Sequence, residues 1–305
     1  MPQASIDIGS NSILLTIVGD DGAILHDEAT VVGLGRGLGD RGLFQDDRMT
    51  AGEDTLGRYV ELARVGGVQA SEIRAVATSG ARRALNAEAW FRRLRSSLGL
   101  KIRIISGDEE ARLTALGALR DLTLPAGPTL VVDLGGGSTE LVLSEGTTVL
   151  ERASLEIGSV RLTEHYLLDG SSTFAPGVVD PAMLARLRAH VDAAVATFGF
   201  TTLPRSVIGV AGSVTTLACM ALDLDTYDSE RVHGSQLTRA DLQTFIDLLL
   251  PTTPRERRAM VPTSPGRADF LLAGATILER VLVASKRQHL RVSDRGLRFG
   301  LLASA

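Results

Sequence analysis

Apolar and polar positions follow the same order at two places along the chain. Residues 5–8 form an apolar run that contains an aspartate, and a short turn of Gly, Ser and Asn separates it from a second apolar run. Residues 131–134 repeat this arrangement 126 positions later, with Gly and Ser in the turn. Each copy continues through another Gly-containing turn into a third run of strand-forming residues. The repeat predicts two similar halves, each of which opens with three strands.

Helical periodicity and further short apolar runs alternate after each of these openings. We expect the principal helices at about 48–65, 87–98, 239–250 and 266–285, and further strands at 72–77, 101–105, 206–211 and 289–293. This order predicts an α/β protein of two related domains. The Pro- and Gly-rich break after Leu122 places the domains at residues 1–124 and 125–305. The last helix, about 295–305, is expected to pack back on the first domain.

The tips of the two repeated turns are suited to bind phosphate. Glycine lets the backbone come close to a ligand, and successive N–H groups of such a turn can surround an anion. An aspartate just before the turn can hold a metal ion against the phosphate. Asp7 and Asp133 are therefore candidate metal ligands, and the pattern leaves open which of them coordinates directly. The candidate phosphate-binding residues are Gly9, Ser10, Asn11, Ser12, Gly135, Gly136, Gly137 and Ser138.

Composition narrows the class of protein. The 305 residues are 44% hydrophobic and 22% charged, with a net charge of −4, which gives no general attraction to nucleic acid or to an anionic membrane. No apolar run is long enough to span a bilayer, and the N-terminus enters a strand without a signal-peptide pattern. Cys219 is the only cysteine, so no internal disulfide can form. We expect a cytoplasmic protein with no nucleic-acid or membrane partner.

Several familiar motifs are absent or out of context. The segment Gly37-x-Gly39-x-x-Gly42 has the spacing of a dinucleotide-binding turn, but it does not open a helix and is expected to be a surface loop. Neither lysine follows a glycine, which excludes a P-loop. The five histidines are scattered without zinc-ligand spacing.

Two adjacent acids begin the helix predicted after residue 105. Ser106 with Glu109 three positions later is typical of a capping box, which gives Glu109 a structural role. Glu110 is not explained by the cap. It is either a solvated acid favoured by the helix dipole or a general base that activates water at the edge of a cleft.

Two other segments follow predicted strands and are candidates for anion binding. Arg82 lies after strand 72–77, where the carboxyl end of a strand in an α/β sheet faces the ligand crevice, although a solvated arginine is the alternative. Ala211-Gly212-Ser213 joins a strand to a helix N-terminus, which is typical either of an anion site or of close packing.

These features together resemble the exopolyphosphatase / guanosine pentaphosphate phosphatase (Ppx/GppA) family of the actin-like ATPase and sugar-kinase superfamily. The resemblance extends over nearly the whole chain, and the combination of its segments is specific. The segments are, in order, 7–12, 77–86, 105–113, 133–140, 158–164, 231–234 and 293–298.

The resemblance implies two related actin-like (ribonuclease H-like) domains that flank an interdomain cleft. It also assigns roles to particular residues. Glu110, the acid before Ala-Arg-Leu, matches the catalytic glutamate, Asp133 matches the aspartate that organises metal and water, and Arg82 matches the phosphate-binding arginine. The implied cofactor is Mg²⁺ or Mn²⁺. The chain looks like the short two-domain form of the family, and its loop at residues 211–213 does not imply ATP binding.

The activity implied by the resemblance is that of an exopolyphosphatase, which releases terminal orthophosphate from inorganic polyphosphate by metal-assisted attack of water. The alternatives are a guanosine pentaphosphate (pppGpp) 5′-phosphohydrolase and a non-catalytic sensor that binds polyphosphate or an alarmone. A sugar or acid kinase is a third possibility, distinguished by its acceptor. The expected partners are therefore inorganic polyphosphate or guanosine pentaphosphate, and a second copy of the chain in a homodimer.

Overall fold

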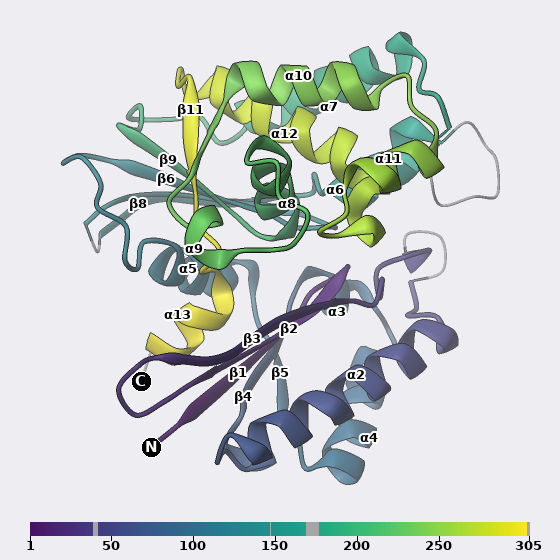
Figure 1. Cartoon of the computed structure of the whole chain (residues 1–305), viewed down its shortest axis with the longest axis vertical. Coiled ribbons are helices and arrows are strands. Elements are labelled where there is room, and N and C mark those ends of the chain that lie inside the picture. Colours follow the sequence, from purple (N-terminus) through teal and green to yellow (C-terminus); the bar gives the residue numbers. More distant parts are fainter. Residues whose placement is uncertain (39–41, 147, 169–176, 304–305) are drawn as a thin grey trace. The chain divides into compact units, whose positions relative to one another are not determined.

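The computed structural model describes residues 1–38, 42–146, 148–168 and 177–303 (Figure 1). These residues form two compact units. Unit 1 contains the described residues within 1–117 and the final helix, which begins at Leu297, and unit 2 contains those within 118–296. The division thus falls at residue 117, whereas the sequence analysis placed it at residue 124.

Unit 1 contains a five-stranded sheet in the order β3-β2-β1-β4-β5. The first three strands are antiparallel neighbours, and β1, β4 and β5 run parallel. The strands are β1 (Gln3–Ile8), β2 (Ser12–Val18), β3 (Ile24–Val31), β4 (Arg74–Ala77) and β5 (Ile102–Ile104). The helices are α2 (Asp46–Val65), η1 (Ala70–Glu72), α3 (Ser79–Arg83), α4 (Ala87–Leu98), α5 (Gly107–Ala118) and α13 (Leu297–Ala303).

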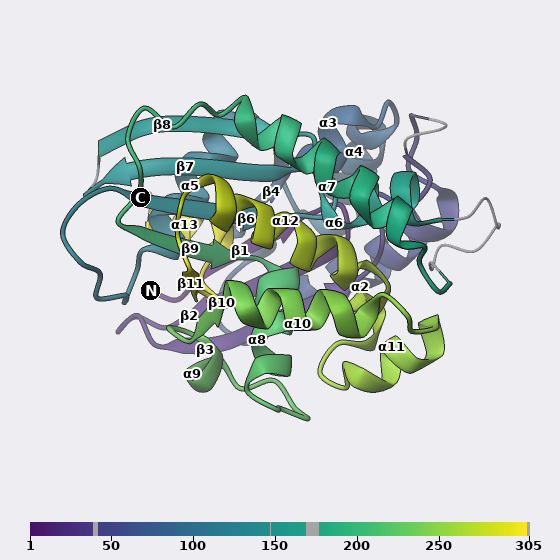
Figure 2. The same cartoon turned by 90° about the horizontal axis from the view of Figure 1, so that it is seen from above.

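Unit 2 contains a six-stranded sheet in the order β10-β11-β9-β6-β7-β8. The strands are β6 (Thr129–Leu134), β7 (Thr139–Glu145), β8 (Thr148–Leu155), β9 (Ser206–Val210), β10 (Gln236–Thr238) and β11 (His289–Val292). The helices are α6 (Ser159–Leu162), η2 (Thr163–Leu167), α7 (Pro181–Ala196), α8 (Gly212–Ala221), α9 (Ser229–Val232), α10 (Arg239–Leu249), α11 (Pro254–Met260), η3 (Pro265–Phe270) and α12 (Leu271–Ala284). Within this unit, α12 lies between α7 and α10 (Figure 2) and is almost wholly buried.

The two sheets repeat one topology. Read from its antiparallel edge, unit 1 runs β3-β2-β1-β4-β5 and unit 2 runs β8-β7-β6-β9-β11, with the same directions at every pairing. Only β10 has no counterpart in unit 1, since it pairs antiparallel with the outer edge of β11. Even the register shift near the end of the second strand recurs, at Ile17/Val18 and at Leu143/Ser144. The prediction of an α/β protein with two related halves is confirmed.

Local signals explain where several helices begin. Asp180 accepts a hydrogen bond from the Ala182 N–H at 2.7 Å, with Pro181 at the first helical position of α7. Thr238 and Asp241 form a reciprocal capping box at the start of α10. The single helix predicted at 266–285 was wrong in its first turn, because the structure has a separate 3₁₀ segment, η3, before α12.

The final helix, α13, is part of unit 1 and is fixed to it by polar and steric contacts. The Ser5 hydroxyl donates to the Arg298 carbonyl at 2.9 Å, and the Arg298 guanidinium forms two bonds to Asp27 at 2.7 and 2.8 Å. A Cβ atom at Gly300 would overlap the backbone carbonyl of Leu113 in α5. Glycine is therefore needed where these two helices meet.

The rejected dinucleotide-binding spacing does not form part of a regular element in the described chain. Gly37 lies in a turn with φ of 67° and Gly42 has φ of 62°, while Gly39 lies outside the described residues. Among the described residues, no helix combines the length and apolar character that a membrane span requires.

Candidate functional site

The loop between β1 and β2 is closed by its own backbone and held by the segment that follows β3. The Gly9 N–H donates to the Ser12 carbonyl at 3.0 Å. The Ser10 carbonyl accepts from the Gly35 N–H at 2.6 Å, and the Asn11 carbonyl accepts from two N–H groups of residues 32–33 at 2.9 and 2.8 Å. These contacts use the carbonyl groups of Ser10 and Asn11, so the N–H groups of these two residues are the candidate ligands of an anion.

The loop between β6 and β7 closes in the same way. The Gly135 N–H donates to the Ser138 carbonyl, again at 3.0 Å. Its outer support differs, because the first turn of α6 donates three N–H groups at 3.0 Å to the carbonyls of Gly135 and Gly136. A Cβ atom at Gly158 would overlap the Gly136 backbone, so glycine is required at this approach.

The two candidate metal-binding aspartates occupy the same register position in their sheets. Asp7 on β1 faces Leu14 on β2, whereas Asp133 on β6 faces Glu140 on β7. Directly opposed residues lie on one face of the sheet with Cβ atoms about 5 Å apart. Unit 2 therefore places two carboxylates together where unit 1 places one beside a leucine.

Glu140 is a candidate that the sequence analysis did not assign a role. Its residue is only 2% exposed, and its Oε1 atom accepts from the Ser154 hydroxyl at 2.7 Å. A carboxylate buried beside a second one is costly unless a cation or hydrogen bonds compensate. The available signal was the glutamate itself, because it interrupts an otherwise apolar strand beside a loop that contains Asp133.

The carboxylates of unit 2 fit a hard divalent cation that retains other ligands. Within the described part of the chain, no cluster of three or more His, Cys, Asp or Glu side chains is arranged to enclose a metal ion. Mg²⁺ is commonly held by one or two carboxylates and completes its shell with water and phosphate oxygens. The Asp133–Glu140 pair matches this donor set better than Asp7 alone does.

Glu110 lies in the first turn of α5, and its buried carboxylate forms an ion pair with the partly exposed side chain of Arg82. The Glu110 side chain is 8% exposed, and its Oε2 atom accepts from Arg82 Nη1 at 2.6 Å. Arg82 Nη1 also donates to the Ile105 carbonyl at 3.0 Å. The structure thus brings together two residues that the sequence analysis singled out separately, both in unit 1. The arrangement excludes a fully solvated Glu110.

Glu109 is placed differently from its neighbour. Its N–H donates to the Ser106 hydroxyl at 3.1 Å, which is one half of the predicted capping box, and its carboxylate pairs with Arg103 at 2.8 Å and is more exposed than that of Glu110. Two acids that are adjacent in sequence therefore have separate environments. The carboxylate of Glu109 pairs with Arg103 near the surface, and that of Glu110 is buried and pairs with an arginine that follows β4.

Asn86 has a structural role in unit 1. Its side chain donates to the Phe44 carbonyl and accepts from the Phe44 N–H, both at 2.9 Å, so it pairs with the backbone as another strand would. This contact connects the segment after α3 with the chain that enters α2. Asn86 is therefore explained without a ligand.

The segment Ala211–Ser213 in unit 2 is closely packed. Ala211 has φ of 78°, which is uncommon for a residue other than glycine. The space that a Cβ atom of Gly212 would need is filled by the guanidinium of Arg267, and the Ser213 hydroxyl lies 3.4 Å from that of Ser159. These contacts favour the close-packing interpretation of the segment.

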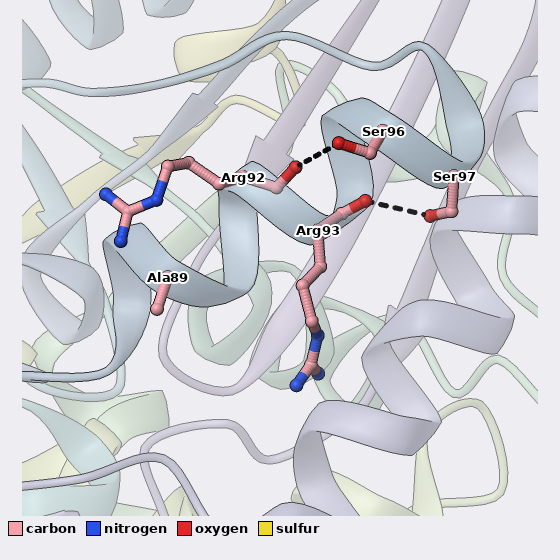
Figure 3. Close-up of a pocket in the computed structure, with 5 residues that line it drawn as sticks. All are labelled: Ala89, Arg92, Arg93, Ser96 and Ser97. Carbon is pink, nitrogen blue, oxygen red and sulfur yellow. Dashed lines mark hydrogen bonds between the residues drawn. The ribbon is translucent and has the colours of Figure 1, made fainter.

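A shallow surface depression lies over α4 in unit 1 (Figure 3). It is lined by Ala89, Arg92, Arg93, Ser96 and Ser97, which are all exposed. The Ser96 and Ser97 hydroxyls donate to carbonyls of their own helix, and Arg93 pairs with Glu53. None of the candidate site residues contributes to this depression.

The fold and these residues define a class of protein before any comparison is made. Each unit carries an aspartate followed by a tightly closed Gly/Ser loop, and unit 1 adds a buried glutamate that is paired with an arginine. This combination is typical of α/β proteins that act on phosphate groups. Residues 16–305 match the Ppx/GppA phosphatase family, and the chain belongs to that family.

Individual relatives agree with this assignment. Exopolyphosphatase 2 of Mycobacterium tuberculosis is 36% identical over 292 residues, which cover 91% of this chain and 89% of that protein. The guanosine-5′-triphosphate,3′-diphosphate pyrophosphatase of Photobacterium profundum is 33% identical over 169 residues, which cover 54% of this chain and 33% of that protein. The crystal structure of the Aquifex aeolicus member of the Ppx/GppA family matches with a TM-score of 0.82 at 32% identity and covers 100% of this chain and 97% of its own.

Proposed function

We propose that this protein is an exopolyphosphatase that releases terminal orthophosphate from inorganic polyphosphate by attack of water. The observation that carries the proposal is the buried Glu110 carboxylate held by Arg82 at 2.6 Å, because a positioned acid beside a phosphate-binding arginine is what hydrolysis of a phosphoanhydride requires. The similarity to exopolyphosphatase 2 of Mycobacterium tuberculosis over 91% of the chain supports polyphosphate as the substrate.

In this proposal the loop N–H groups and Arg82 bind the terminal phosphate. The candidate loops are residues 9–12, which belong to unit 1, and residues 135–138, which belong to unit 2. Backbone N–H groups and a guanidinium stabilise charge on the equatorial phosphate oxygens. Most of the rate enhancement would come from this positioning and charge stabilisation.

Glu110 is the proposed general base. It would accept a proton from a water molecule as the water oxygen forms its bond to the terminal phosphorus. The bond from that phosphorus to the bridging oxygen breaks, and the shortened chain leaves with the bridging oxygen. The products are orthophosphate and a polyphosphate one residue shorter.

A divalent cation, Mg²⁺ or Mn²⁺, is the proposed cofactor. Asp133 would hold it, with Glu140 opposite on β7 as a supporting ligand and Asp7 as the weaker candidate from unit 1. When bound, the ion supplies positive charge that neutralises phosphate oxygens. The buried position of Glu140 beside Asp133 supports a cation in unit 2.

Guanosine pentaphosphate is the second candidate substrate. The relative from Photobacterium profundum carries the name of an enzyme for that nucleotide, and the match covers about half of this chain. Removal of its 5′-terminal phosphate needs the same base, arginine and loops, so these residues do not distinguish the two substrates. The non-catalytic sensor would need neither a positioned base nor a metal.

One experiment separates these functions. Purified protein with Mg²⁺ is incubated with short polyphosphate, long polyphosphate and guanosine pentaphosphate, and free orthophosphate is measured without an added acceptor. We expect release from polyphosphate at a higher kcat/KM than from the nucleotide. Faster release from the nucleotide would reverse the order of the candidates. Binding of both substrates without release would indicate a sensor, and transfer only to an added acceptor would indicate a kinase.

The cellular location, the partners and the oligomeric state of the protein are also proposals. The net charge of −4 and the single cysteine support function in the cytoplasm without a nucleic-acid or membrane partner. The homodimer stays a prediction, which the elution volume of the purified protein would test.

A further inference from the structure

Arg82 donates its hydrogen bonds within the protein through one nitrogen of its guanidinium, Nη1. A guanidinium carries five N–H hydrogens, two on each terminal nitrogen and one on Nε. Nη1 has two acceptors, the Ile105 carbonyl at 3.0 Å and Glu110 Oε2 at 2.6 Å, so both of its hydrogens are used. Among the residues that the structure describes, Nε and Nη2 have no hydrogen-bond partner, and the side chain is 26% exposed.

The two edges of this group therefore have different environments. The Nη1 position is fixed between the carbonyl at the end of β5 and the first turn of α5, which sets the plane of the whole guanidinium. The Nε–Nη2 edge is the one that donates two parallel hydrogen bonds to a phosphate or carboxylate. This edge is available to a ligand without breaking either bond of Nη1.

We infer that Arg82 binds the terminal phosphate through Nε and Nη2 while it continues to hold Glu110 through Nη1. The inference rests on the proposed function and deepens it. One rigid plane then fixes both the phosphate and the base, so Arg82 is a substrate ligand and also a positioning residue for Glu110.

The competing arrangement is an exchange, in which phosphate displaces Glu110 from Arg82. The two arrangements differ in what Glu110 does to phosphate binding. In the bridge, Arg82 contributes equally to affinity whether or not residue 110 is charged. In the exchange, Glu110 competes with phosphate, so Glu110→Gln would tighten binding, and this gain would depend on Arg82.

The test is a double-mutant cycle that uses binding and turnover as separate readouts. Orthophosphate binding is measured by calorimetry, and turnover is measured on polyphosphate, for wild type, Arg82→Ala, Glu110→Gln and the double variant. We expect Arg82→Ala to weaken phosphate binding by about 10- to 100-fold in both backgrounds, as for loss of a charged hydrogen bond. We expect it to lower kcat in both backgrounds, but at least about tenfold more in wild type than with Glu110→Gln, because only the wild type also loses the positioning of its base.

A conservative variant, a chemical rescue and a control pair show whether the effects arise from a loss of folding. Arg82→Lys retains the charge but lacks the planar fork, so we expect partial recovery of binding without recovery of kcat. Added methylguanidinium should restore part of the kcat of Arg82→Ala, whereas methylammonium should not. The matched control is the neighbouring pair Arg103 and Glu109, whose Arg103→Ala and Glu109→Gln variants should show no coupling in kcat.

Three results would overturn the inference. The first is a Glu110→Gln variant that binds phosphate tenfold more tightly and loses the gain with Arg82→Ala, which is the exchange. The second is an Arg82→Ala effect on kcat that is equally large without Glu110. The third is full recovery by Arg82→Lys. If the proposed function is wrong, the wild type releases no phosphate from polyphosphate. The calorimetric measurements of orthophosphate binding still test the role of Arg82 in that case.

Discussion

The loops of unit 1 and unit 2 share a backbone but differ in their surroundings. In each loop, the first glycine donates to the carbonyl of the closing serine at 3.0 Å. In each unit, the aspartate is the penultimate residue of the corresponding strand, β1 or β6. The segments that hold the two loops in place are different. Loop 9–12 is supported by the segment after β3, whereas loop 135–138 is supported by the first turn of α6.

The difference between the units indicates a division of chemical roles. Unit 2 places Glu140 opposite Asp133, while the equivalent pairing in unit 1 is Leu14 opposite Asp7. Unit 1 in turn carries Glu110 and Arg82, which follow its parallel strands. We propose that the repeat supplies two phosphate-binding loops, that unit 2 adds the cation and that unit 1 adds the base.

The largest expected effect comes from removing the base of unit 1. Glu110→Gln should lower kcat by roughly 10²–10⁴-fold, the usual contribution of a positioned general base, while polyphosphate binding is retained. The measurement is phosphate release together with polyphosphate affinity. Glu109→Gln is the control, because its carboxylate pairs with Arg103 at the surface and should leave turnover nearly unchanged. Equal losses in the two variants would remove the distinction between these acids.

The repeat itself could be read from the sequence because its signals are local. The strand–aspartate–turn pattern is contained in eleven consecutive residues, and it fixed the two related α/β halves in advance. The caps at Asp180 and Thr238 are local in the same sense, since the side chain and its backbone partner are two or three positions apart. Predictions of this kind depend on neighbours along the chain.

The remaining features depend on contacts that the sequence does not display. The Arg82–Glu110 pair joins positions 28 residues apart, and only the fold shows that one guanidinium reaches both Glu110 and the Ile105 carbonyl. Glu140 became a candidate metal ligand only when the register of β7 against β6 placed it opposite Asp133. Short elements such as α9 and β10 were missed because a few residues carry too little periodicity.

The next largest effect should separate the two aspartates. Asp133→Asn should lower turnover by about 10²–10³-fold at ordinary Mg²⁺, because charge stabilisation by a metal is worth several kcal/mol, with partial recovery at high Mg²⁺ or with Mn²⁺. Asp7→Asn should cost clearly less, because its cross-strand partner on β2 is Leu14 and not a glutamate. The measurement is the metal dependence of phosphate release.

Two outcomes would contradict this asymmetry. Equal losses in Asp133→Asn and Asp7→Asn would show that the units share the metal equally. Full activity of the wild type in excess chelator would remove the metal from the mechanism and leave Asp133 as a residue that shapes its turn.

A smaller effect should distinguish the supports of the two loops. Gly158→Ala places a methyl group within the backbone of Gly136, so the loop or α6 must shift, at a cost of roughly 1–3 kcal/mol in stability together with reduced activity. Gly35→Ala is the matched change in unit 1, where the added atom would lie 3.0 Å from Ser10 Cβ and needs a smaller adjustment. Thermal unfolding and phosphate release measure both. A more damaging Gly35→Ala would reverse the comparison.

The smallest effect concerns the edge strands, β3 in unit 1 and β8 in unit 2. Glu28 on β3 accepts from Arg58 at 2.6 and 2.9 Å, and this hydrogen bonding lowers the pKa of the Glu28 carboxyl from 4.5 to about 2. A lowered carboxyl pKa stabilises the fold above pH 4.5, and the contribution is lost as the pH falls from 4.5 towards 2. Both side chains are partly exposed, so Glu28→Gln should cost only about 0.5 kcal/mol at pH 7.

Trp90 allows this effect to be assigned to one unit. It is the only tryptophan and is buried in unit 1, so its fluorescence during urea unfolding reports on the unit that contains β3. We expect the deficit of Glu28→Gln relative to wild type to be present at pH 7 and to shrink steadily between pH 4.5 and pH 2. Glu151→Gln on β8 is the control, because Glu151 accepts from the Thr201 N–H at 2.9 Å and lies in unit 2. A Glu28→Gln deficit that stays constant down to pH 2 would show that the contribution of Glu28 is packing and not the charge shared with Arg58.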